Sequence, residues 1–258
     1  MKELFQFLKR DQLFIFLGIF ILVIFSWIYL FYSSSTLPAE TSESIIQDMV
    51  MPQVNNWNIN DVLALFVMWS VMMMAMMLPS ATPMILIFST INKKKNERGN
   101  GFVPTWTFLS GYILVWIGFS IIAVIIQWIL HYFALMSSDF KLINPSVSGI
   151  VLIAAGVYQF TPIKNACLRH CQTPLGFIMG NWRYGKRGAL IMGLKHGLYC
   201  VGCCWVLMSL LFLAGIMNIL WIALIAVFIL IEKIVRRDRY VSYAAGFALM
   251  MLGSWLII

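Results

Sequence analysis

Charged side chains are scarce in this chain of 258 residues: Asp, Glu, Lys and Arg make up 11% of it, and hydrophobic residues make up 61%. A soluble domain carries about 25% charged residues. Several apolar runs reach about 18 residues or more, which is the length that a helix needs to cross a bilayer. The composition therefore excludes an ordinary soluble domain and predicts an all-α, polytopic membrane protein.

Acidic residues are the scarcest charged group, and none lies in the interior of an expected span, since Asp61 stands only at the first position of one. Magnesium and calcium bind oxygen ligands, so this absence argues against their transport. The sequence also lacks a nucleophile–base arrangement, a glycine-rich phosphate loop and paired intramembrane carboxylates. These absences argue against a hydrolase, a kinase or a proton pump, and they leave little support for an enzymatic function.

The basic residues predict the topology. Of the 18 Lys and Arg, all but Lys141 and Lys195 fall in segments expected on one side. By the positive-inside rule this predicts about seven transmembrane helices, with the N-terminus inside and the C-terminus outside. The net charge of +8 thus indicates membrane topology, with a lipid bilayer rather than nucleic acid as partner. The expected location is the cytoplasmic membrane of a prokaryote. The expected spans are at about residues 12–32, 61–91, 105–130, 146–162, 188–213, 218–231 and 240–258.

The chain is expected to fall into two parts. Residues 1–60 predict an N-terminal membrane anchor helix and an acidic external loop, and residues 61–258 predict a six-helix metal-binding core. No Ala-x-Ala pattern follows the first apolar segment, so we expect it to be a retained span rather than a cleaved signal peptide. None of the 5 cysteines lies in the acidic loop, which gives no indication of an external disulfide framework.

The most unusual stretch is residues 193–217, because it places polar donors inside an apolar run. If it is helical, His196, Cys200, Cys203 and Cys204 fall within an arc about 100° wide. Thiols and an imidazole in hydrocarbon require a reason, and they are the groups that soft metals or redox chemistry use. A packing interpretation stays open, because small residues lie on the same side at a spacing of four: Ala189, Gly193 and Gly197.

Two further groups extend this pattern. Cys167, His170 and Cys171 form C-x-x-H-C at the expected cytoplasmic boundary, and five methionines lie in residues 72–77. Met72 and Met76 share a helix face and lie at about the same membrane depth as Cys200. Thioethers suit Cu(I), although methionine also fills irregular gaps in helix packing. Pro79 and Pro83 remove helix hydrogen bonds and predict a kink just after this cluster.

Taken together, these motifs resemble a family of integral membrane proteins of unknown function that is described as metal-binding and copper-chaperone-like. The likeness extends over residues 61–233 and rests on W-S-x-M-M-M-A-M-M-L-P-S (69–80), Y-Q-x-T-P-x-K-x-x-C-L-x-x-C (158–171), G-L-Y-C-V-G-C-C-W-V-L-M (197–208), G-x-M-N (215–218) and E-K (232–233). The resemblance implies a role with metal but establishes no activity.

The first hypothesis is a membrane protein that binds a soft metal, with Cu(I) ahead of zinc, and transfers or delivers it through the bilayer. Its ligands would be His196, Cys200, Cys203, Cys204, Cys167, His170, Cys171, Met72 and Met76. A copper-dependent membrane enzyme or a soluble metal chaperone would be its partner. The alternatives are a membrane thiol–disulfide oxidoreductase, and an accessory or assembly subunit whose cysteines are only packed.

Overall fold

The computed structural model describes residues 10–35, 58–96, 103–133, 145–235 and 240–257. Every regular element in these ranges is a helix, which confirms the predicted all-α class. The expected acidic loop, with Glu40, Glu43 and Asp48, lies almost entirely outside the described ranges. The helices are α2 (Arg10–Ser35), α4 (Ile59–Asn96), α5 (Thr105–Tyr132), α6 (Pro145–Phe160), α7 (Pro162–Gln172), α8 (Pro174–Gly180), α9 (Gly185–Ser209), α10 (Leu211–Ala214), α11 (Ile219–Ile234) and α12 (Tyr240–Ile257).

Five of the described helices are long and apolar enough to cross a membrane: α2, α4, α5, α9 with α10, and α12. A sixth span is present if α6 and α7 together form one bent segment. Helix α11 stands where a span was expected, but its 16 residues fall short of the usual length. The chain thus has the helices of a multi-pass membrane protein, whereas the count of seven and the orientation stay predictions.

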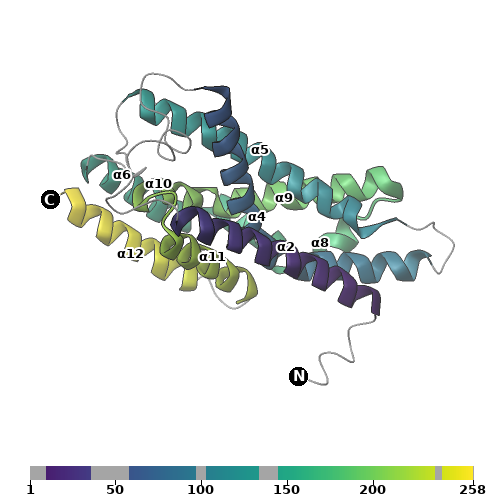
Figure 1. Cartoon of the computed structure of the whole chain (residues 1–258). Coiled ribbons are helices and arrows are strands. Elements are labelled where there is room, and N and C mark those ends of the chain that lie inside the picture. The colour runs from purple at the N-terminus through teal and green to yellow at the C-terminus, as the bar shows by residue number, and fades with distance from the viewer. Residues whose placement is uncertain (1–9, 36–57, 97–102, 134–144, 236–239, 258) are drawn as a thin grey trace.

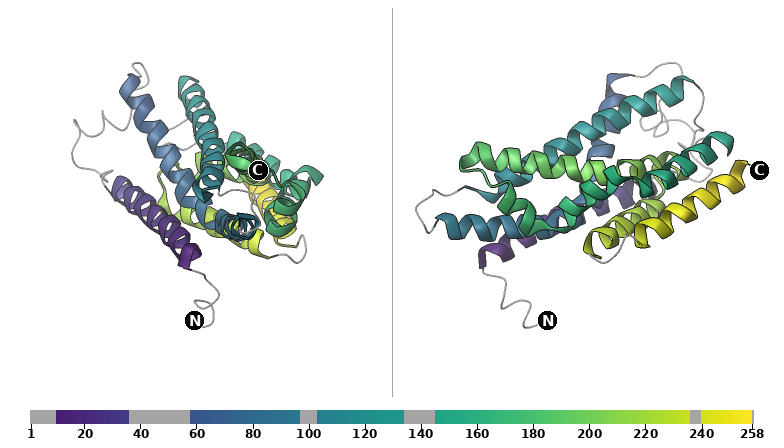
Figure 2. Two further views of the ribbon diagram at one scale, coloured as in Figure 1. Left: turned by 90° about the vertical axis from the view of Figure 1, so that its right-hand side faces the viewer. Right: turned by 180° about the vertical axis from the view of Figure 1, so that it is seen from behind.

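The helices run roughly side by side in an elongated bundle (Figures 1 and 2). Helix α9 packs closely against α5 and also against α7, while α12 packs along α6. Helix α2 lies along α4 on the outside of the bundle, and only 11% of its most apolar 18-residue stretch is buried. Helix α9 carries three of the cysteines. Their side chains are buried among α9 and the helices that pack against it.

Glycines allow α5 and α9 to approach closely. A Cβ atom added at Gly193 would collide with the backbone carbonyl of Phe108, and one added at Gly111 would lie 2.9 Å from the backbone nitrogen of Leu194. Two helix backbones can come this close only where side chains are absent from the contact. The small residues on α9 therefore do dock another helix, as the packing interpretation expected.

The boundary between α6 and α7 is set by Thr161 and Pro162. The hydroxyl of Thr161 accepts a hydrogen bond from the Lys164 backbone nitrogen at 3.3 Å, and Pro162 occupies the first turn, where its missing N–H costs nothing. The chain bends by 63° here. The expected fourth span, at about residues 146–162, ends at this bend, and the bend brings α7 against α9.

Helix α4 changes direction along its length, as Figures 1 and 2 show from opposite sides. Pro79 and Pro83 lie in its interior and cannot donate to the preceding turn. Hydroxyl groups bond the backbone nearby: Ser80 donates to the Met77 carbonyl and Thr82 to the Leu78 carbonyl, both at 2.9 Å. The predicted kink thus places Met77 and Ser80 where their polar atoms can meet neighbouring helices.

Candidate metal centre

Three thiols lie on the buried side of α9. Cys200, Cys203 and Cys204 are each exposed by 1% or less. Cys203 and Cys204 follow Cys200 by about one helical turn, and their thiols donate to the Cys200 carbonyl oxygen at 3.1 and 2.8 Å. The thiols therefore point into the protein and not toward lipid.

A fourth thiol reaches this place from α7. Cys171 is 9% exposed, and its side chain interacts with the thiols of both Cys200 and Cys203. Because the bend at Thr161 turns α7 onto α9, residues that are 29 positions apart come together. The structure thus joins the two Cys/His groups of the sequence, but through Cys171 alone.

An ammonium group completes the surroundings of Cys200. Lys233, near the end of α11, is buried, and its Nζ donates to the Cys200 sulfur at 2.9 Å and to the Ser80 hydroxyl at 2.8 Å. A cation held in a protein interior requires a partner that carries negative charge. Sequence reasoning gave Lys233 no role, although the Glu-Lys pair was among the motifs that carried the resemblance.

Tyr112 of α5 links Cys200 to α4. Its hydroxyl lies 3.2 Å from the Cys200 sulfur and donates to the Met77 carbonyl at 3.2 Å. Tyr112 is 1% exposed. Four helices, α4, α5, α9 and α11, therefore contribute polar atoms around one sulfur, and α7 adds a second sulfur.

A buried ion pair stands beside this cluster. Lys164 of α7 donates to Glu232 of α11 and to Gln159, and Ser242 of α12 donates to Glu232 at 2.5 Å. Glu232 is only 2% exposed within α11, and the Lys164 ammonium neutralises its charge there.

His196 lies one turn before Cys200 among aromatic rings. It is 3% exposed and stacks on Tyr112 and Phe108, with ring centroids 5.4 and 6.2 Å apart, and it also contacts Phe177. Its Nδ1 atom has no hydrogen-bond partner among the described residues. The imidazole is thus within the predicted group of residues, but its described contacts are with rings and not with thiols.

Cys167 and His170 lie at the edge of the cluster. Cys167 is half-buried, packs against Gly202 and interacts with Cys203. His170 stacks on Tyr199 with ring centroids 4.1 Å apart, and its Nδ1 atom is 2.8 Å from the Ala166 carbonyl. Within the described residues the structure therefore brings Cys167 toward the thiols but not His170.

The two predicted methionine ligands are fully buried, Met72 at 0% and Met76 at 1% exposure. No described contact joins either thioether to a cysteine. Helix α4 meets Cys200 instead through the Met77 carbonyl and the Ser80 hydroxyl, each by way of a side chain from another helix. Met72 and Met76 are thus core residues of the same bundle, and a role as metal ligands stays a prediction.

The candidate donor side chains do not form a complete metal-binding site in this conformation. Among the residues that the structure describes, no three His, Cys, Asp or Glu side chains are arranged to hold a metal ion. Hydrogen bonds explain this arrangement, because Cys203 and Cys204 are turned to a carbonyl and Cys200 to an ammonium. Two buried cysteines from different helices, Cys171 and Cys200, still come together where α7 packs against α9, and all five cysteines are free thiols.

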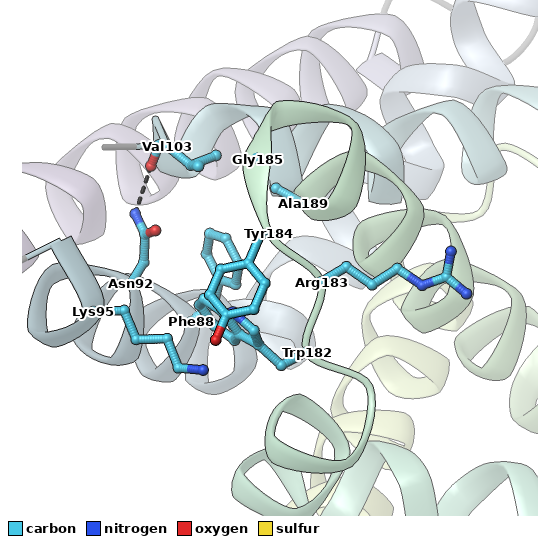
Figure 3. A pocket seen from close by; sticks show the side chains of 9 residues that line it. All are labelled: Phe88, Asn92, Lys95, Val103, Trp182, Arg183, Tyr184, Gly185 and Ala189. Carbon is cyan, nitrogen blue, oxygen red and sulfur yellow. Dashed lines mark hydrogen bonds between the residues drawn. The ribbon is translucent and has the colours of Figure 1, made fainter. Parts of the chain in front are cut away.

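A separate cavity lies between the C-terminal part of α4, Val103 just before α5, and the segment from Trp182 into the first turns of α9. Figure 3 shows the Lys95 side chain lying beside the rings of Trp182 and Tyr184, with Nζ 4.4 and 5.0 Å from their centroids. Asn92 donates to the Val103 carbonyl at 2.5 Å. The cavity measures about 10 Å³, which leaves room for about one water molecule. The cavity is therefore too small for a larger ligand, and the residues around Cys200 are the candidate functional site.

Comparison with known proteins identifies the family. Residues 66–256 match the family model PpoB2, which is described as "Copper chaperone". No curated protein and no solved structure matches the chain. The match extends over most of the 258 residues and includes every cysteine, Lys233 and the methionines of α4. The resemblance noted in the sequence is confirmed, and the chain belongs to the PpoB2 family of copper chaperones.

Proposed function

We propose that this protein binds Cu(I) inside the membrane between the thiols of Cys171 and Cys200 and delivers it to a partner protein. The copper chaperone family supports the metal, and the long apolar helices support a multi-pass membrane location. The observation that carries the proposal is that two buried thiols from different helices, Cys171 of α7 and Cys200 of α9, come together where these helices pack against each other.

Copper(I) suits these donors better than zinc does. It is a soft ion that prefers thiolates and thioethers, and it is stable with only two sulfur ligands. A structural zinc site requires about four ligands in a closed tetrahedron. Because Cys203 and Cys204 donate to a backbone carbonyl, two thiols are immediately available and two are held one hydrogen bond away.

The neighbouring thiols would provide a route by which copper enters and leaves the site between Cys171 and Cys200. Cys167 is half-exposed and interacts with Cys203, which in turn interacts with Cys171. Copper would pass along these sulfurs by exchanging one thiolate at a time, so the ion never leaves its ligands. Met72 and Met76 would serve as weaker ligands on the α4 side, and His170 and His196 as flanking donors. A copper-dependent membrane enzyme or a soluble metal chaperone would be the partner.

Elemental analysis of the purified full chain tests the proposal. We expect about one copper per chain after loading with Cu(I) under reducing, oxygen-free conditions. Cys171→Ser and Cys200→Ser should each lose most of it, and Cys167→Ser should keep it, because Cys167 lies on the route and not in the final pair. A wild-type chain without bound copper would overturn the proposal, and so would a Cys171→Ser/Cys200→Ser double variant that still holds copper.

The thiol–disulfide oxidoreductase is not favoured by the geometry. Such an enzyme must present a reactive thiol to another protein. Cys200 and Cys204 are 0% exposed and Cys203 is 1% exposed, so no partner disulfide reaches them in this conformation. The accessory subunit accounts for the close packing of α5 on α9 but not for a buried ammonium bonded to the Cys200 sulfur. Replacing all five cysteines by serine separates the hypotheses, since a packing role would survive it.

A further inference from the structure

Lys233 stands out among the buried cations that the structure describes. Lys164 has a carboxylate partner, Glu232. Lys233 is equally enclosed, yet its described bonds go to the Ser80 hydroxyl and to the Cys200 sulfur. Nothing in the proposed function uses this ammonium, although it touches one of the two proposed ligands. Burying an ammonium without a negatively charged partner is strongly unfavourable.

We infer that Lys233 is the counter-ion of the loaded site and that its charge selects a monovalent ion over a divalent one. The inference rests on the proposed function, since it assumes that Cys171 and Cys200 are the ligands. Two thiolates carry two negative charges, and Cu(I) and the Lys233 ammonium carry one positive charge each. The loaded site is then neutral, which is the state that a low-dielectric interior favours.

A divalent ion breaks this balance. Zinc between the same two thiolates leaves one uncompensated positive charge next to the ammonium. A third thiolate would restore neutrality, and the nearest candidates are Cys203 and Cys204. Each of them donates to the Cys200 carbonyl, at 3.1 and 2.8 Å, so recruiting either one breaks a buried hydrogen bond. The same ammonium thus favours Cu(I) and disfavours Zn(II).

The position of Lys233 is fixed by its neighbours on α11. Glu232 precedes it and is bonded to Lys164 on α7, the helix that also carries Cys171. The Gln172 side chain donates to the Glu232 carbonyl at 2.8 Å. These bonds hold α11 to α7, so that the ammonium and the second sulfur arrive at Cys200 together. The ammonium is a hydrogen-bond donor to a ligand sulfur, and such neighbours tune metal affinity.

Competition titrations on the purified full chain test the inference, with a Cu(I) chelator for copper and a Zn(II) indicator for zinc. Lys233→Gln keeps a donor for Ser80 and Cys200 but removes the charge. We expect it to weaken Cu(I) binding roughly tenfold or more while Zn(II) binding is unchanged or tighter. Lys233→Arg keeps the charge and should hold the ratio of the two affinities within about threefold of wild type.

Lys195→Met is the matched control. Lys195 is likewise a lysine within an apolar run, but it lies on α9. Its ammonium donates to the Asn181 side chain at 3.4 Å, away from the thiols. Its removal should leave both affinities unchanged. Metal-free thermal unfolding of each variant identifies loss of fold. If Lys233→Gln does not fold, competition binding to the wild-type chain tests the inference instead. The wild-type chain must then bind Ag(I), a redox-inert monovalent probe, in preference to Zn(II) and Cd(II).

The outcomes separate the two proposals. Loss of all copper binding in wild type overturns the proposed function. Copper binding that depends on Cys200 but shows the same Cu(I) to Zn(II) ratio in wild type and Lys233→Gln overturns the counter-ion role alone. A wild-type chain that prefers Zn(II) or Cd(II) to Ag(I) also overturns it.

Discussion

The hydroxyl of Tyr112 lies 3.2 Å from the sulfur of Cys200, although 88 residues separate them in the chain. The same hydroxyl donates to the Met77 carbonyl, in the turn of α4 that the prolines disturb. One side chain therefore ties α5 to the cysteine helix and to the kinked helix at once.

Tyr112→Phe tests the structural side of this contact. The ring still fills its place between Trp116 and His196, but the Met77 carbonyl loses a donor in a buried position. We expect the free energy of unfolding to fall by about 1 kcal/mol. Copper stoichiometry should not change, because the phenol is not a ligand in this account. Thermal unfolding in detergent measures the effect.

Tyr240→Phe is its control, since Tyr240 is 74% exposed. That change should shift the unfolding free energy by less than about 0.5 kcal/mol. Equal effects of the two substitutions would show that the bond to Met77 contributes nothing.

Glu232→Gln should destabilise the fold more strongly. It leaves the Lys164 ammonium buried with only the Gln159 carbonyl oxygen and a neutral amide beside it. Breaking one side of a buried ion pair costs about 3–5 kcal/mol. Chemical unfolding of the metal-free chain measures this loss.

The double variant Glu232→Gln/Lys164→Met should recover much of this stability, because it removes the stranded charge as well. If the double variant is less stable than Glu232→Gln alone, the pair does not act as a neutralising unit.

The helices and the places where they break could be predicted from the sequence, because both are local properties. Hydropathy located α2, α4, α5, α9 and α12, and the expected end of the fourth span at about residue 162 coincides with the bend before α7. Hydropathy overestimated α11, which is apolar but short. Asn218, whose side chain accepts bonds from the backbone of Leu220 and Trp221, begins this helix at the expected place.

The candidate site could be predicted only in part, because its members come from different helices. The spacing of Cys200, Cys203 and Cys204 placed three thiols on one side of a helix, and they are buried together. Nothing in the sequence says which helices pack, so the arrival of Lys233 and Tyr112 at Cys200 could not be found that way. The Glu-Lys motif was the one signal for Lys233. His170 belonged to the same motif as Cys171, but stacking on Tyr199 holds it elsewhere.

Glycine substitutions test how α5 and α9 hold the site together. A Cβ atom at Gly193 would run into the Phe108 carbonyl, whereas one at Gly118 would meet nothing within 4 Å. Gly193→Ala must push α5 from α9 and so separate Tyr112 from Cys200. We expect it to lose several kcal/mol of stability or fail to fold, as overpacking against backbone does.

Gly118→Ala, on the same pair of helices, should leave stability unchanged or raise it by up to about 1 kcal/mol. Thermal unfolding compares the two. Gly193→Ala at wild-type stability would mean that the two backbones do not approach this closely.

Copper-edge X-ray absorption on the loaded full chain tests the central claim most directly, since it counts the sulfur atoms bound to the metal. The account predicts a first shell of about two sulfurs in wild type and in Cys167→Ser, and a loss of sulfur in Cys171→Ser and in Cys200→Ser. A first shell made of nitrogen or oxygen would contradict it, as would a sulfur shell that stays the same when Cys171 and Cys200 are both replaced.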